Sequence, residues 1–386
     1  MQRRYFDYAA TTPLDSEVLK EMLPHMEENF GNPSSVYSYG REARKVIDDS
    51  REKVAKIIGA QSKEIFFTSG GTESDNWAIK GTAFANKDKG NHIITTSVEH
   101  HAVLHTCKYL EKQGFEVTYL PVDEYGLIDL DDLRNSIKDT TILITVMFAN
   151  NEIGTIQPIG EIGKIAKEKK ILFHTDAVQA LGSIEIDVNT LGVDLMSISG
   201  HKIYGPKGIG ALYIRKGVKI DNLIHGGAQE KKKRGGTENT PAIVGFAKAC
   251  ELAESNLQEQ IKRTIQLRDY MIKGILEGIP EVKLNGHPEK RLPGNVNVSI
   301  RYIEGESILL SLDLLGIAAS SGSACTSGSL DPSHVLLAIG LSHEIAHGSL
   351  RFSIGKYTTK EEVDFVLDKL PGIIQRLRDM SPLYNV

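Results

Sequence analysis

The sequence predicts an α/β fold, in which a mainly parallel sheet is covered by helices and followed by a smaller α+β domain. Between about residues 60 and 215, short β-rich runs alternate with amphipathic helical stretches such as 159–169. Such alternation favours a parallel sheet with helices on both faces. A long helical segment, 241–276, then leads away from this region. We therefore expect three parts: an N-terminal segment at 1–14 that packs with the small domain, a large domain at 15–255, and a small C-terminal domain at 256–386.

Short apolar runs bounded by turn residues predict the strands. Seven of them belong to the large domain, at 64–68, 93–97, 116–120, 142–149, 171–175, 194–199 and 211–214. Two more, at 295–300 and 350–354, belong to the small domain. Ligands of parallel sheets bind beyond the carboxyl ends of the strands. Polar residues at those ends are therefore the candidates for a functional site.

Composition and charge argue against several classes of function. The net charge of −5 over 386 residues gives no electrostatic reason to expect a nucleic-acid partner. No apolar run approaches the roughly 18 residues of a membrane helix, and the first residues lack the apolar core of a secretory signal. The cysteines, Cys107, Cys250 and Cys325, have no CxxC spacing. This argues against a disulfide framework or a structural zinc site, and a reducing cytoplasm is the expected location.

Lys202 lies in a glycine-rich turn between two apolar runs, 193–198 and 209–214. Burial between strands disfavours an ammonium ion, and a desolvated amine is prepared for Schiff-base chemistry. Taken alone, the residue is also explained as a solvated lysine in a turn. The rest of the chain has to decide between these interpretations.

Two further strand ends add the other parts of a cofactor site. After the strand at 64–68, the turn 69–72 leads into a helix whose free amides and positive dipole end favour an anion; an ordinary N-cap turn is the alternative. Asp176 lies at the end of the apolar strand predicted at 171–175. Its carboxylate could hold a proton on a heteroaromatic ring nitrogen, or it could cap the following helix. A phosphate cradle, a carboxylate for a pyridinium and Lys202 for an aldehyde together predict a pyridoxal phosphate site.

Three other candidates are less specific when each is taken alone. His100 or His101, after the strand at 93–97, could stack on a cofactor ring and move protons, or both could cap the next helix. Asn151 is a polar residue just after the strand predicted at 142–149, and an ordinary turn also explains its position. Arg351 lies in an apolar strand, where its fork of donors suits either a substrate carboxylate or an internal salt bridge.

Cys325 lies in a stretch of serine, glycine, alanine and threonine at 320–329. Free cysteines are usually buried and inert, but these neighbours can hardly form a core. The composition therefore predicts an exposed thiol in a polar loop, and an exposed thiol is a liability unless it is used.

With these motifs the chain resembles, nearly end to end, the cysteine desulfurases of the NifS/IscS type in the class-V aminotransferase family. The resemblance is carried, in order, by residues 5–12, 31–35, 68–74, 150–154, 176–179, 199–202, 234–239, 321–325 and 351–353. It implies a pyridoxal phosphate enzyme of fold type I with a seven-stranded, mainly parallel sheet. It also implies a homodimer with its sites at the subunit interface.

The roles that this resemblance implies fall on named residues. Lys202 would bind the aldehyde of the cofactor and then move the α-proton of the substrate. Asp176 would pair with the ring nitrogen, and His100, rather than His101, would stack on the ring. The remaining cofactor contacts would come from Gly71, Thr72, Asn151, Gln179, Ser199 and His201, and, toward the cofactor of the other subunit, from Thr237.

The substrate residues follow from the same resemblance. Arg351, with Asn151 nearby, would bind the carboxylate of L-cysteine. Cys325 would attack the substrate sulfur as a thiolate, keep it as a persulfide and leave L-alanine. The sulfur would go to an iron–sulfur scaffold protein for cluster assembly, and a transient iron–sulfur cluster on Cys325 would be the chain's one metal contact. Tyr37 stands where family members often have histidine, which we do not expect to affect the chemistry.

Two other classes of function remain open on the sequence. A selenocysteine lyase or another fold-type-I aminotransferase would keep the cofactor site, and an aminotransferase would not need Cys325. A sulfur carrier or scaffold partner without catalysis would need neither Lys202 nor the cofactor.

Overall fold

The computed structural model describes residues 3–321, 332–382 and 384, so Cys325 lies outside the described residues. Its centre is a seven-stranded sheet of order β2-β8-β7-β6-β5-β3-β4. Only β8 runs antiparallel to its neighbours, β2 and β7. The predicted mainly parallel sheet is therefore confirmed. Its strands are β2 (Ile65–Thr68), β3 (His92–Thr96), β4 (Glu116–Leu120), β5 (Thr141–Thr145), β6 (Leu172–Asp176), β7 (Leu195–Ser199) and β8 (Gly210–Ile214).

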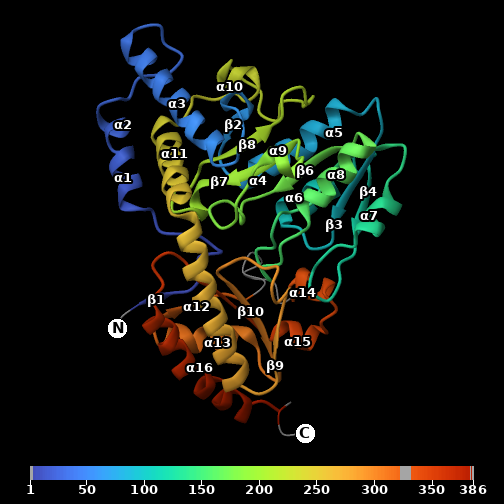
Figure 1. Ribbon diagram of the computed structural model, residues 1–386, viewed down its shortest axis with the longest axis vertical. Helices are drawn as coiled ribbons and strands as arrows, with labels where there is room; N and C mark the ends of the chain where they lie inside the picture. The colour runs from blue at the N-terminus through green and yellow to red at the C-terminus, as the bar shows by residue number, and fades with distance from the viewer. Residues whose placement is uncertain (1–2, 322–331, 383, 385–386) are drawn as a thin grey trace.

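Helices cover the sheet, and most of its strands are buried at every residue, as in a parallel sheet covered on both faces (Figure 1). The predicted helix at 159–169 is α8 (Ile159–Lys169), whose apolar face packs into the main core. The other helices of this part are α1 (Ser16–Met22), α2 (Pro24–Glu27), α3 (Ser38–Lys56), α4 (Gly71–Asn76), α5 (Thr82–Ala85), α6 (His101–Glu111), α7 (Leu130–Ser136), α9 (Val188–Leu191), α10 (Gln229–Lys232) and α11 (Thr240–Ser255).

The long helical segment predicted at 241–276 is two helices, α11 and α12 (Leu257–Gly278). They are separated at Asn256, whose backbone is non-helical (φ −122°, ψ 12°). Asparagine favours such a break because its side chain competes with the helical hydrogen bonds. Figure 1 shows α12 carrying the chain from the sheet to the second, lower part of the molecule.

That second part has its own core around an antiparallel sheet of order β12-β10-β9. Its strands are β9 (Val282–Leu284), β10 (Asn295–Ile300) and β12 (Ser349–Ser353), and its helices are α13 (Gly305–Asp313), α14 (His334–Ala338), α15 (His343–His347) and α16 (Lys360–Asp379). Within the described ranges, no helix is long and apolar enough to cross a lipid bilayer.

The N-terminal segment runs along the second core before it reaches the large sheet. β1 (Arg4–Tyr5) pairs in parallel with β11 (Ile317–Ala318), and the fully buried Phe6 belongs to the second core. Asp7 then bridges to Ser353 of β12. The segment is thus placed between the two cores; the exact domain boundaries stay a prediction.

One predicted strand, 142–149, is shorter than expected. Regular β5 ends at Thr145, although the amide of Phe148 still donates to the carbonyl of Asp176 at 2.8 Å. Ala149 instead pairs with Ile156 in an isolated bridge. The apolar run therefore continues past the sheet because the loop that follows β5 is itself buried.

Candidate active site

The sequence-predicted cofactor residues meet at one edge of the large sheet. Asp176 and Ser199 are the last residues of the neighbouring strands β6 and β7. Lys202 follows in the 3-10 turn Gly200–Lys202, and Gly71 opens α4 directly after β2. Because the carboxyl ends of parallel strands share an edge, residues far apart in the chain lie together there.

Lys202 is held by the N-terminal segment. Its ammonium donates to the carbonyl of Ala10 at 2.8 Å and to the carbonyl of Ala9. Gln179 donates its side-chain amide to the same Ala9 carbonyl at 2.9 Å. Nearby, the ring of His201 lies 3.2 Å from the Thr11 hydroxyl. The segment therefore fixes both Lys202 and the side chains around it.

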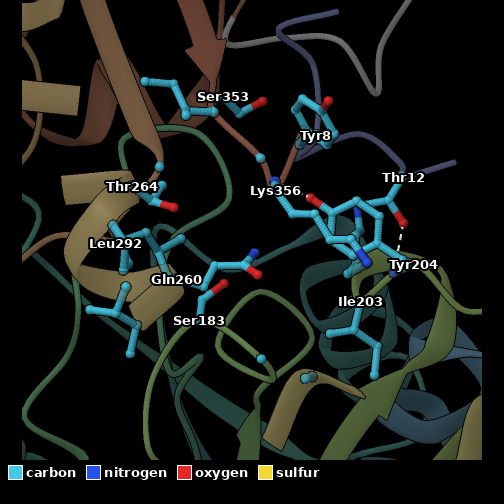
Figure 2. Close-up of a pocket in the computed structure, with 18 of the residues that line it drawn as sticks. Tyr8, Thr12, Ser183, Ile203, Tyr204, Gln260, Thr264, Leu292, Ser353 and Lys356 are labelled. Carbon is cyan, nitrogen blue, oxygen red and sulfur yellow. Dashed lines mark hydrogen bonds between the residues drawn. The ribbon is translucent and has the colours of Figure 1, made fainter. Parts of the chain in front are cut away.

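A cavity of about 450 Å³ lies beside Lys202, between the N-terminal segment, α12 and the second core. Figure 2 shows Tyr8, Tyr204 and Lys356 on one side of it and Gln260 and Thr264 on the other. The described residues that line this cavity include Lys202 and Gln179 but neither Asp176 nor His100. It is therefore adjacent to the candidate active site and separate from the place where a ring would contact Asp176.

Asp176 is an almost fully buried carboxylate. One oxygen accepts the backbone N–H of Val178 at 2.9 Å. Burial raises its pKa to about 6, while that hydrogen bond and the charge of Lys202 act in the opposite direction. At neutral pH the carboxylate is therefore ionised, and it can pair with a protonated ring nitrogen.

The turn before α4 combines a glycine backbone with an unpartnered hydroxyl, two features that suit an anion. Gly70 has φ +149°, which L-residues rarely adopt, and a Cβ on Gly71 would lie 2.6 Å from Cγ2 of Val178. The buried Ser199 hydroxyl has no hydrogen-bond partner among the described residues, and Thr72 is exposed. An unpartnered donor beside a glycine turn suits a phosphate. With Asp176 and Lys202, the residues present fit pyridoxal phosphate.

The two histidines after β3 have different surroundings. His100 is the N-cap of α6, and its Nδ1 accepts the N–H of Ala102 at 3.1 Å. Burial and the charge of Lys202 both lower its pKa, so its ring is neutral. His101 instead packs between other imidazoles, with ring centroids 5.0 Å from His105 and 4.8 Å from His334. The structure thus places His100 within the electrostatic reach of Lys202, and its stacking role stays a prediction.

Arg351 forms an internal ion pair, which was the alternative to binding a substrate carboxylate. Its Nη2 lies 2.9 Å from Oδ1 of Asp7, and its Nη1 donates to the backbone carbonyl of Asn151 at 2.8 Å. Its Nε is buried and has no hydrogen-bond partner among the described residues. The guanidinium therefore keeps its Nε–H for a further acceptor.

The remaining predicted residues are less completely placed. Thr237 is exposed and lines a cavity of about 240 Å³ together with Ser69 of the same chain, so its reach toward another subunit stays a prediction. Cys325, the predicted nucleophile, lies outside the described residues. The other two cysteines, Cys107 and Cys250, are buried, and burial raises the pKa of both thiols.

Sequence reasoning assigned no role to two buried acids beside the site. Asp75 on α4 is 1% exposed, and Glu99, next to His100, is fully buried. Glu99 accepts the Met147 amide at 2.9 Å, and burial raises its pKa to about 8. Asp75 directly follows the motif at 68–74 and Glu99 directly precedes His100, but nothing in their spacing distinguishes a buried acid from a solvated one.

Comparison with known proteins agrees with this geometry. Residues 4–366 match the family described as Aminotransferase class-V. The chain is 64% identical over 379 residues to "Cysteine desulfurase IscS" of Methanosarcina thermophila, covering 98% of this chain and 94% of that protein. It is 61% identical over 383 residues to "Cysteine desulfurase IscS" of Clostridium botulinum, covering 99% and 96%.

Solved structures give the same assignment. A "NIFS-LIKE PROTEIN" superposes with a TM-score of 0.92 at 43% identity, over 97% of this chain and all of the other. "SspA in complex with cysteine" superposes with a TM-score of 0.83 at 40% identity, over 93% of this chain. The chain therefore belongs to the class-V aminotransferase family and, within it, to the cysteine desulfurases of the NifS/IscS type.

Proposed function

We propose that this chain removes sulfur from L-cysteine with pyridoxal phosphate, giving L-alanine and a persulfide on Cys325. The observation that carries the proposal is the meeting of Lys202, Asp176 and the unpartnered Ser199 hydroxyl at the strand ends, in a chain of this family. Bound pyridoxal phosphate supplies an aldehyde that takes up the substrate amine and a ring that accepts electrons from its α-carbon.

Lys202 first holds the cofactor and then acts as a base. To react, its amine has to leave the carbonyls of Ala9 and Ala10, which accept hydrogen bonds from its ammonium form. With cofactor and substrate bound, the Lys202 amine would take the α-proton of the substrate and return it. Asp176 keeps a proton on the ring nitrogen, since its carboxylate is ionised at neutral pH.

Arg351 supplies the binding site for the substrate carboxylate. Its buried guanidinium contacts Asp7 and the carbonyl of Asn151, and its Nε remains for a carboxylate oxygen. A guanidinium fork orients a carboxylate in a plane, which fixes the α-carbon relative to Lys202.

The sulfur transfer requires a thiolate, and the described cysteines do not provide one. Cys107 and Cys250 are buried, with thiol pKa values raised by that burial. Cys325 therefore takes the role: its sulfur attacks the substrate sulfur, the new S–S bond forms, and the carbon–sulfur bond breaks with its electrons passing to the carbon. Protonation of that carbon gives alanine, and Cys325 keeps the sulfur as a persulfide.

The cellular setting belongs to the same proposal. The persulfide passes its sulfur to an iron–sulfur scaffold protein. The similarity to cysteine desulfurases named IscS supports this. The protein acts as a cytoplasmic homodimer with Thr237 reaching the neighbouring subunit's cofactor. The exposed position of Thr237 supports this arrangement, because it leaves the hydroxyl open to a partner.

Two variants test the mechanism separately. Lys202→Ala keeps Cys325 but is expected to lose the visible absorbance of the lysine-bound cofactor. Cys325→Ala is expected to keep that absorbance but to lose alanine and sulfide production from cysteine, whereas Cys250→Ala, a buried thiol, keeps both products. Sulfide release by Cys325→Ala at the wild-type rate would contradict the proposed nucleophile, and amino transfer to an added keto acid would indicate an aminotransferase.

A further inference from the structure

A buried polar cluster lies behind Asp176, on the same face of the sheet. Side chains alternate along a strand, so His174 and Asp176 of β6 point to one face. In the sheet register Ser197 of β7 is opposite Asp176, and Thr145 of β5 is opposite His174. All four are buried, and α4 packs against β7 over this region.

His174 connects the members of the cluster. Its Nδ1 lies 2.8 Å from the Thr145 hydroxyl, and its Nε2 lies 3.0 Å from the Ser197 hydroxyl. Oδ1 of Asp75, from α4, is 3.7 Å from the same Nε2. Burial lowers the pKa of His174 to about 3, so the ring is neutral and Asp75 has no cation there to pair with.

Asp75 therefore has the surroundings of a neutral acid. It is 1% exposed, and its Oδ1 has no hydrogen-bond partner within the described part of the chain. Its charged neighbours are Asp176 and Glu99, both acids, and the Ser197 hydroxyl, which lies 3.0 Å from Nε2 of His174, acts on its pKa in the opposite direction. Burial, and then the charge of Asp176, raise the pKa of Asp75. Lys202 is the cation that acts on Asp176.

Two adjacent buried carboxyl groups cannot both ionise without a second cation. Asp176 has the backbone N–H of Val178 and the charge of Lys202 in its favour, whereas Asp75 has only the Ser197 hydroxyl. The ionised member of the pair is therefore Asp176. Glu99, a third buried acid, has its pKa raised in the same way.

We propose that Asp75 is a positioning residue for Asp176: it stays a carboxylic acid beside His174 and Ser197, and so leaves Asp176 as the single charged carboxylate that faces the cofactor ring. This inference rests on the proposed function for the identity of the cofactor. Its physical effect is on Asp176, because a second negative charge behind that residue would raise its affinity for a proton and weaken its hold on a ring N–H.

Infrared spectroscopy of the cofactor-bound protein at neutral pH tests the protonation directly. A carboxylic acid has a C=O stretch separate from that of a carboxylate, and carbon-13 labelling of aspartate carboxyls distinguishes Asp75 from Glu99. We expect an aspartic acid band that Asp75→Asn removes and that Asp194→Asn retains. Asp194 is the matched control, since it binds the Phe173 amide at 3.0 Å near the opposite ends of β6 and β7. A band that persists in Asp75→Asn overturns the proposal.

Cofactor affinity tests the effect on Asp176. Asp75→Asn, which keeps a neutral group of the same shape, should bind pyridoxal phosphate within about threefold of wild type. Asp75→Ala, which removes the carboxyl group next to the His174 and Ser197 pair behind Asp176, should bind it at least about tenfold more weakly. Asp194→Ala leaves the Phe173 amide without its acceptor, away from the site, and should bind the cofactor as the wild type does. Wild-type affinity in Asp75→Ala would overturn the positioning role.

These outcomes separate the inference from the proposed function. If the wild-type protein itself does not bind pyridoxal phosphate, the proposed function fails. The infrared comparison of the cofactor-free protein then still decides whether Asp75 carries a proton. If the wild type binds the cofactor but Asp75→Asn shifts its affinity by more than tenfold, only the inference fails.

Discussion

Arg351 and Asp7 form an ion pair, with 2.9 Å between Nη2 and Oδ1, that ties β12 to the N-terminal segment. Two residues later the same segment presents the Ala9 and Ala10 carbonyls to Lys202. Thr12 then bonds to the carbonyl of His201, with its hydroxyl at 2.9 Å. One short stretch of backbone therefore connects the proposed carboxylate site to the proposed Schiff-base lysine.

Arg351→Lys should weaken substrate binding more than it slows the chemical step. A lysine keeps the positive charge, but it cannot contact Asp7, the Asn151 carbonyl and a carboxylate in one plane as the guanidinium can. We expect KM for cysteine to rise by about tenfold or more, with a smaller change in kcat. Steady-state kinetics measure both values. An unchanged KM with a reduced kcat would exclude a role for Arg351 in binding the carboxylate.

Glu99→Gln should flatten the dependence of stability on pH. Burial raises the pKa of Glu99 from its ordinary value near 4.5 to about 8, so the folded state binds this proton more tightly than the unfolded state. The stabilisation by that proton is complete below about pH 4.5 and is lost as pH rises through 8. At ~1.4 kcal/mol per pKa unit, the rise from 4.5 to about 8 makes this loss on the order of 5 kcal/mol.

Melting temperatures of the cofactor-free protein between pH 5 and 9 measure this effect. The wild type should lose more stability toward pH 9 than Glu99→Gln does, because the amide cannot ionise. The exposed Glu124 provides the control, and Glu124→Gln should follow the wild-type curve. Parallel curves for wild type and Glu99→Gln would show that Glu99 is already ionised in the folded protein at neutral pH.

Gly71→Ala should weaken cofactor binding through the shape of the turn. A Cβ there would lie 2.6 Å from Cγ2 of Val178, whose backbone N–H bonds to Asp176. Overpacking of this kind typically costs about 1–3 kcal/mol. Pyridoxal phosphate titrations should show weaker binding, and Val178→Ala in the same chain should restore much of it by making room. Gly160→Ala is the control, since a Cβ on Gly160 meets nothing within 4 Å.

Arg51 and Glu230 should contribute to stability as a pair. They form a bidentate ion pair of 2.6 and 2.7 Å with both side chains buried, and Glu230 also accepts the Phe67 amide at 2.9 Å. The pair holds a turn in which Glu230, Lys231 and Lys232 all have positive φ. Breaking a buried pair leaves one charge uncompensated, so Arg51→Ala should lower the free energy of unfolding by about 3–5 kcal/mol.

Urea denaturation measures that loss. The exposed pair of Lys45 and Asp49, at 3.1 Å, is the comparison, and Lys45→Ala should change stability by less than about 1 kcal/mol. If Arg51→Ala and Lys45→Ala had equal effects, the buried pair would not be what holds this turn.

Much of the architecture was predictable because it depends on local patterns. The strands β4 and β10 and the helix α8 have the bounds expected from periodicity and turn residues. The long segment at 241–276 was not predicted to break, since one asparagine in an amphipathic run gives only a weak local signal. The early end of β5 was not predicted for a related reason. An apolar run indicates burial, whether or not the strand stays paired.

The sequence by itself determined the residue types of the site and their order on successive strand ends, which was enough to predict pyridoxal phosphate chemistry and the family. Only the tertiary structure decided how those residues are held. The carbonyls of Ala9 and Ala10 carry no side-chain signal, and the pairing of Arg351 with Asp7 joins residues from opposite ends of the chain. The charge of Asp75 depends on how completely α4 buries it beside Asp176, which is a property of packing rather than of local sequence.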